Sequence, residues 1–63
     1  MTAEMTEIQA LRLALYALMR DHHAYEVDVQ ESILDEAKDH FRGRLAENEQ
    51  AQRIILAKIE ALQ

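Results

Sequence analysis

The stretch from Ile8 to Met19 constrains this chain most, because ten of its twelve residues are apolar. It holds no Gly or Pro, and its one β-branched residue is the first, a composition that strongly favours a helix. A helix that is apolar around much of its circumference must be covered by neighbours. We therefore expect an all-α protein in which this segment is packed inside a bundle.

The length of 63 residues allows one small helical domain, residues 1–63, without an internal repeat or linker. Such a chain is below the size at which a single core gives comfortable stability, and it has no Cys to form a disulfide. We therefore expect it to oligomerise or to dock on a larger protein.

The first helix is predicted over about Thr6 to Tyr25. Thr6 followed by Gln9 fits a capping box, in which each side chain accepts a backbone N–H of the other residue. Apolar residues then recur at alternating spacings of three and four, which is a heptad seam. Its members are Ile8, Leu11, Leu15, Leu18, His22, Tyr25 and Val29.

A second helix is predicted over about Val29 to Leu62, after a turn at Tyr25 to Asp28. Asp28 with Glu31 three residues later resembles an N-cap, although the absence of Gly and Pro also permits one unbroken helix. The second seam contains Leu34, Phe41, Leu45, Asn48, Ile55, Ile59 and Leu62, with Lys38 and Gln52 in the same register. Asn48 and Gln52 place a polar layer in mid-seam, which can fix register.

Gly43 leaves a second architecture open. It follows the cations Lys38, His40 and Arg42, as at a helix C-terminus, so a three-helix unit with a break at Gly43 is the alternative. The seam continues through Leu45, which favours one long helix that tolerates Gly43 at a cost of about 1 kcal/mol.

We therefore predict a hairpin of two long antiparallel helices that dimerises into an antiparallel four-helix bundle. The layout looks like that of Rop-type hairpins, a resemblance of architecture alone. The longer second helix should project its end, Arg53 to Leu62, beyond the first. The predicted self-association or partner interface is Ile8, Leu11, Leu15, Leu18, Leu34, Phe41, Leu45, Ile55, Ile59 and Leu62.

Four acidic residues, Asp28, Glu31, Asp35 and Asp39, are spaced by three and four, so they should form a row on one face of the second helix. Such a row is usually a solvated face. It can also dock on a basic surface and occlude a nucleic-acid site of another protein.

Histidines and carboxylates are the remaining candidates for chemistry. His22, His23, Glu26, Glu36 and His40 could meet near the turn and bind a metal, but the inward Glu-x-x-His pairs of di-iron bundles are missing. We therefore predict no metal and no cofactor. His22, as a polar seam residue, is expected to be partly buried and hydrogen-bonded, with a pH-sensitive contact as the alternative.

The overall charge of −5 disfavours nucleic acid and anionic membranes as partners. Lys38, Arg42 and Arg44 are the basic group that could hold nucleic acid. Lys38 and Arg42 lie at helix-neighbour spacings from Asp35, Glu36 and Asp39, with which they should pair. No nucleophile has a base beside it and no Gly-rich loop occurs, so we expect a non-enzymatic, cytoplasmic interaction module that binds itself and another protein. The alternative is a small acidic inhibitor that occludes a basic or nucleic-acid-binding site on a target protein, followed by an RNA-binding helical hairpin or a metal-binding bundle.

Overall fold

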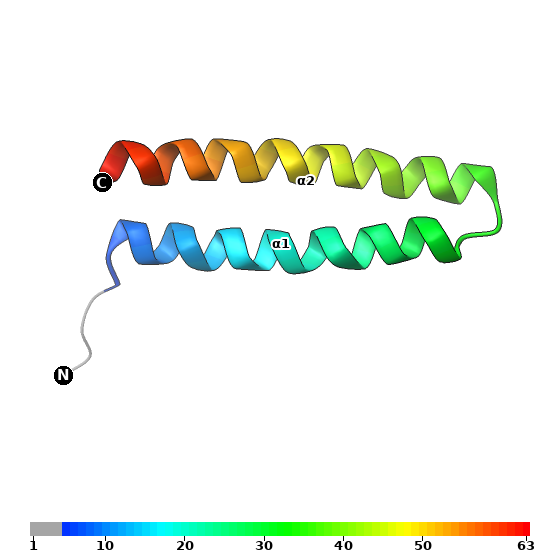
Figure 1. The fold of residues 1–63 in the computed structure, drawn as a ribbon, viewed down its shortest axis with the longest axis horizontal. Coiled ribbons are helices and arrows are strands. Elements are labelled where there is room, and N and C mark those ends of the chain that lie inside the picture. The colour runs from blue at the N-terminus through cyan, green and yellow to red at the C-terminus, as the bar shows by residue number, and fades with distance from the viewer. Residues whose placement is uncertain (1–4) are drawn as a thin grey trace.

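The computed structural model describes residues 5–63 as two antiparallel α-helices joined by a short turn (Figure 1). Helix α1 spans Glu7–Glu31 and helix α2 spans Asp35–Leu62. The predicted all-α hairpin is confirmed.

The start of α1 is fixed by the predicted capping box. The Thr6 hydroxyl accepts a hydrogen bond from the Gln9 N–H at 3.2 Å, and the Gln9 side chain accepts one from the Thr6 N–H at 2.9 Å. Two backbone donors that the helix itself cannot satisfy are thus paired.

The turn lies at residues 32–34, later in the chain than predicted. Ser32 adopts an extended backbone, and both its N–H and its hydroxyl donate to the carbonyl of Asp28, which ends α1. Serine competes for backbone groups in this way, whereas the β-branched Val27 and Val29 weaken a helix by only a few tenths of a kcal/mol. The predicted break at Tyr25 to Asp28 is therefore wrong.

Moving the turn changes the roles of the residues around it. Asp28 and Glu31 lie in the last turn of α1 and do not cap α2. The N-cap of α2 is Leu34, which makes no side-chain capping bond, and the acidic Asp35 and Glu36 occupy the first turn. Leu34 was predicted to belong to the seam, but it is 69% exposed.

The two helices are nearly equal in length, with 25 and 28 residues. Helix α2 continues through Gly43, so the three-helix alternative is wrong. The predicted overhang of Arg53 to Leu62 is also wrong, because Lys58 lies 3.5 Å from Glu7 at the start of α1. The later turn lengthens α1 and shortens α2, which brings the two ends level (Figure 1).

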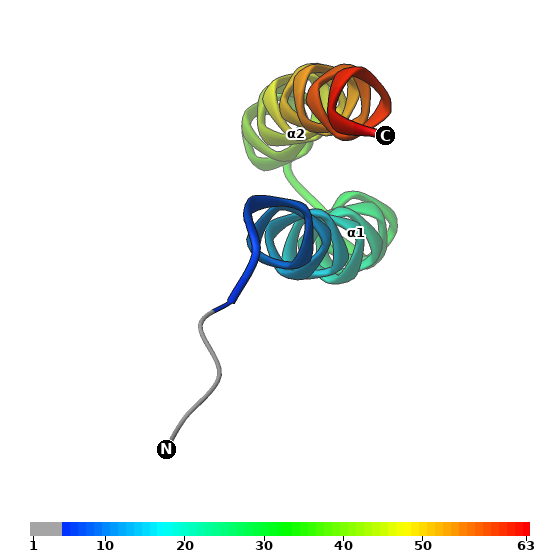
Figure 2. The ribbon, with the colours of Figure 1, turned by 90° about the vertical axis from the view of Figure 1, so that its left-hand side faces the viewer.

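The contact between the helices is formed by the predicted seams, except for Leu34 and Leu62, which are exposed at the two ends of α2. The Tyr25 and Phe41 rings stack with centroids 6.4 Å apart near the turn, and Ile59 is buried near the other end. The hairpin measures 50 × 26 × 11 Å, so it is one helix layer thick, as the end-on view shows (Figure 2). Neither helix in residues 5–63 has the length and hydropathy that a membrane span requires.

Gly43 gives a direct test of helix continuity. A Cβ added there would meet no atom within 4 Å, so Gly43→Ala should raise the free energy of unfolding by about 0.5–1 kcal/mol. Urea unfolding at fixed protein concentration measures the change. The control Ala46→Gly, at an exposed site on the same helix, should lower it by a similar amount. A destabilising Gly43→Ala would show that another surface approaches this position.

Candidate functional site

A polar layer crosses the middle of the hairpin. Asn48 on α2 is 5% exposed, and its Nδ2 donates to the backbone carbonyl of Leu18 on α1 at 2.8 Å. Gln52, one turn further along α2, donates through Nε2 to Oδ1 of Asn48 at 2.6 Å. Both polar groups of the Asn48 side chain therefore have partners, which a buried amide requires. The predicted mid-seam polar layer is confirmed.

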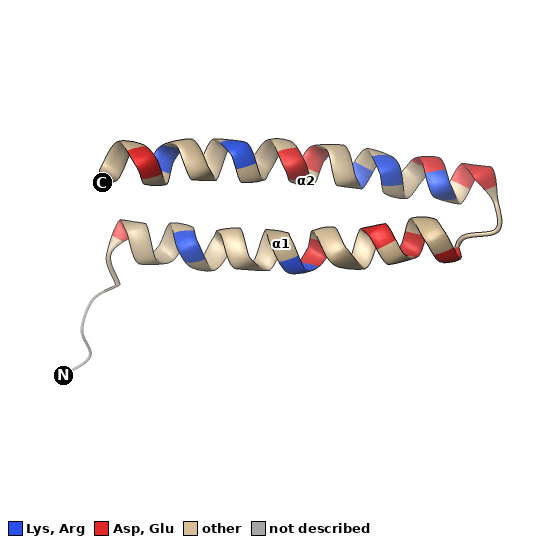
Figure 3. Cartoon of the chain, in the orientation of Figure 1, with Lys and Arg blue, Asp and Glu red and all other residues tan. Residues whose placement is uncertain are grey.

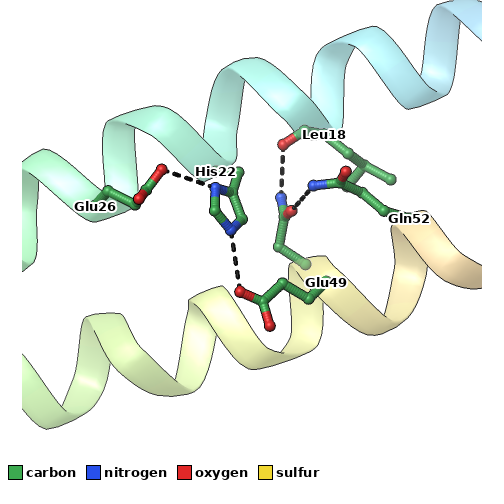
Figure 4. Close-up of polar contacts among 6 residues, drawn as sticks. Leu18, His22, Glu26, Glu49 and Gln52 are labelled. Carbon is green, nitrogen blue, oxygen red and sulfur yellow. Dashed lines mark hydrogen bonds and ion pairs between the residues drawn. The ribbon is translucent and has the colours of Figure 1, made fainter.

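His22 lies beside this layer and links the two helices (Figure 4). Its Nδ1 is 3.0 Å from Oε1 of Glu26 on α1, and its Nε2 is 3.1 Å from Oε1 of Glu49 on α2. The imidazole is about three-quarters covered, while both carboxylates are about half exposed. The expectation of a partly buried, hydrogen-bonded histidine is confirmed.

The geometry around His22 favours its charged form. A neutral imidazole has one N–H, whereas an ionised carboxylate can only accept, so two ionised carboxylates on the two ring nitrogens require an imidazolium. The hydrogen bond to Glu49 is the main cause that raises the pKa of His22 above its ordinary value. The charge and hydrogen bond of Glu26 also raise the pKa, and desolvation opposes them.

The candidate cluster of His22, His23, Glu26, Glu36 and His40 does not come together at one site. His22 contacts Glu26 and Glu49, while His40 packs edge-on against Phe41, with ring centroids 5.3 Å apart. In residues 5–63, no three His, Cys, Asp or Glu side chains are arranged to hold a metal ion. At His22 the two carboxylates contact opposite nitrogens of the ring, so the three side chains do not converge on one position that a metal ion could occupy.

The predicted acidic row is divided between the helices. Asp28 and Glu31 end α1, whereas Asp35 and Asp39 belong to the start of α2, so the row on one helix face is wrong. Acidic residues instead lie on both sides of the turn (Figure 3). The predicted ion pairing of the basic residues nearby is confirmed for Arg42, which lies 3.2 Å from Asp39. Arg44, for which no pairing was predicted, lies 3.5 Å from Glu47.

Open grooves lie between the helices on both sides of the layer. Met19 and Asp21 point about 160° apart around α1, so the grooves that they line belong to opposite faces. One groove is lined by Met19, His22, Glu49, Gln52, Arg53 and Leu56. The other is lined by Leu18, Asp21, Tyr25, Arg44, Glu47, Asn48 and Ala51.

Large apolar side chains remain exposed on every side of the hairpin. Ile33 in the turn is 93% exposed. The other exposed large apolar residues are Met5, Leu13, Tyr16, Met19, Leu34, Ile54, Leu56 and Leu62. Leu34 and Leu62 were predicted as interface residues of the seam, and the structure places them at the two ends of α2.

Sequence reasoning missed Glu49 as the partner of His22. It placed Leu56 on an apolar end of the second helix, but it missed that Leu56 and Met19 line one groove. The contact to Glu49 depends on how the helices align, which follows from the position of the turn. Comparison with known proteins gives no family model that matches the chain, and no curated protein or solved structure with significant similarity to it.

The His22 contacts predict that the hairpin loses stability as the pH rises. A raised pKa in the folded state gives a contribution that is fully present below the unfolded value of about 6.5 and is lost as the pH rises through the folded-state pKa. Urea unfolding between about pH 5.5 and about pH 8.5 should therefore give a higher unfolding free energy at the acidic end.

Two variants test whether His22 causes this pH dependence. His22→Gln should abolish most of it, while His23→Gln, at an exposed neighbouring site, should leave it unchanged. A pH dependence that survives His22→Gln would contradict the assignment.

Asn48 provides a test of the polar layer. Asn48→Asp replaces the donor to the Leu18 carbonyl with an acceptor in a buried site, so it should cost about 1–3 kcal/mol of unfolding free energy. Gln50→Glu makes the same chemical change at an exposed position of α2 and should cost less than about 0.5 kcal/mol. Equal effects of the two variants in urea unfolding would show that the layer is not structurally important.

Proposed function

We propose that this protein is a non-enzymatic interaction module that self-associates through its apolar helix faces and presents its remaining surface to another protein. One observation carries the proposal. Of residues 5–63, Asn48 and Ile59 are the two that are buried, and Asn48 is polar. A hairpin with so little interior needs a further surface to cover its apolar side chains.

The predicted interface residues support self-association by their partial burial. The inner side of each helix is covered by the other helix, yet most of these side chains keep solvent contact. Ile59 is buried, and Ile8, Leu11, Leu15, Leu18, Phe41, Leu45 and Ile55 are half-buried. A second layer of helices would complete their coverage, as in a four-helix bundle.

A small acidic inhibitor is the second candidate. It is favoured by the carboxylates around the turn, where Asp28 and Glu31 end α1 and Asp35 and Glu36 begin α2. They flank the exposed Ile33, so this end combines negative charge with an apolar contact. A basic groove on a target protein has the complementary chemistry.

Light scattering over a concentration series tests the leading proposal. We expect a helical species of twice the 7.3 kDa chain mass that dissociates on dilution. Ile55→Asp should reduce the dimer fraction, because it places a charge at a half-buried seam position, whereas Asp35→Asn at an exposed site should leave the dimer intact. A fully helical monomer at all concentrations would contradict self-association. Loss of association in Asp35→Asn would favour a role for the acidic end instead.

A further inference from the structure

Exposed apolar side chains on the two helices do not all belong to the same face. Met19 and Leu56 line one groove, and Tyr16 lies one turn before Met19 on the same side of α1. Leu13 lies about 120° from Met19 around α1, and Ile54 lies about 160° from Leu56 around α2. We call the surface formed by Tyr16, Met19 and Leu56, with the groove between the helices, the Met19 face.

We propose that the Met19 face is the surface on which a second, antiparallel copy of this chain packs to form a four-helix bundle. The inference rests on the proposed self-association and specifies where it occurs. Each of the three residues is large, apolar and substantially exposed, at 61% for Tyr16, 51% for Met19 and 44% for Leu56. Two of them stand at the rim of a groove that a side chain of the second copy can enter.

The size of the open surface matches one interface. The chain exposes 5167 Å², whereas a compact monomer of 7.3 kDa exposes about 4,200 Å². The excess of roughly 1,000 Å² is close to the ~800 Å² that each partner buries in a standard interface. A second hairpin layer would cover about this much surface.

The charges of this face suit pairing with itself. A two-fold axis brings the same patch of both copies together, so the patch must be compatible with its own charge. The groove contains the carboxylate of Glu49 and the guanidinium of Arg53, four residues apart on α2. Both signs are therefore present, and each copy offers a partner for the charges of the other.

The acidic turn favours the antiparallel arrangement over the parallel one. Asp28, Glu31, Asp35 and Glu36 all lie at the turn end of the hairpin. Parallel packing would place these carboxylates next to their copies. Antiparallel packing separates them by much of the 50 Å length, far beyond the screening length of about 8 Å at physiological salt.

Matched charge substitutions on the two faces test the proposal by sedimentation equilibrium, with helicity recorded for each variant. Met19→Asp and Leu56→Asp should each raise the dimer dissociation constant at least about tenfold, because a carboxylate would be buried at the interface. Leu13→Asp and Ile54→Asp place the same charge on the same helices at similarly exposed sites, and each should change it less than about threefold. The milder Met19→Gln should weaken the dimer while it preserves the helices.

The outcomes separate this inference from the proposed function. If Leu13→Asp or Ile54→Asp dissociates the dimer while Met19→Asp and Leu56→Asp do not, the Met19 face is wrong and self-association stands. A wild-type chain that is monomeric throughout overturns both. If Met19→Asp is unfolded while Leu13→Asp remains a helical dimer, the Met19 face is supported, because Met19 is exposed in the single hairpin.

Discussion

The rest of this structure depends on one constraint, which is that two helices alone form a single layer. Each seam side chain is covered by the opposite helix and by nothing on either side of it, so nearly all of them remain half-buried. Ile59 is the exception among the apolar residues that the structure describes. Packing in larger domains stacks two or three such layers around a core. The sequence supplies apolar residues for a second layer, and the hairpin leaves them on its surface.

Polar contacts stabilise the alignment of the two helices that the turn at residues 32–34 sets. The bond from Asn48 to the Leu18 carbonyl and the contact of His22 with Glu49 lie near the middle of the hairpin, between the aromatic pair at the turn and Ile59 at the far end. Apolar contacts alone tolerate sliding by a heptad, because one Leu layer resembles the next. A slide would leave the Asn48 amide without its acceptor, and an unpaired buried amide costs about 1–3 kcal/mol. The short turn therefore sets the alignment and the hydrogen bonds stabilise it, while association energy comes from apolar surface.

The seams could be predicted from the sequence, but the turn could not. Apolar residues spaced alternately by three and four identify the positions that face the other helix. This holds wherever the turn lies, so residues such as Leu11 and Ile59 face inward under any placement of the turn. The heptad continues from His22 through Tyr25 to Val29, so periodicity gives no sign of where α1 stops. The available signals were Ser32, which bonds back to Asp28, and the acidic first turn that follows. Propensity differences of a few tenths of a kcal/mol at valines do not outweigh them.

The misplaced turn accounts for the errors about the partners of His22, the helix ends and the acidic row. A break at Tyr25 to Asp28 directs His22 toward Glu36 and His40, whereas a break at residues 32–34 directs it toward Glu49. The early break also makes α2 the longer helix and gathers four acids on it, while the later break equalises the helices and divides the acids between them.

The later position of the turn also changes which apolar surface needs a partner. An overhanging end of α2 would have concentrated this need at Arg53 to Leu62. With the ends level, Ile59 is covered by α1, and the exposed apolar residues lie along the sides of the hairpin and at its turn. A groove lined by Met19 and Leu56 then also contains His22 and Glu49, the groups that hold the helices together. Because folding and association share this groove, a variant at His22 alters both, whereas an outward residue such as Met19 reports on association with little change to the single hairpin.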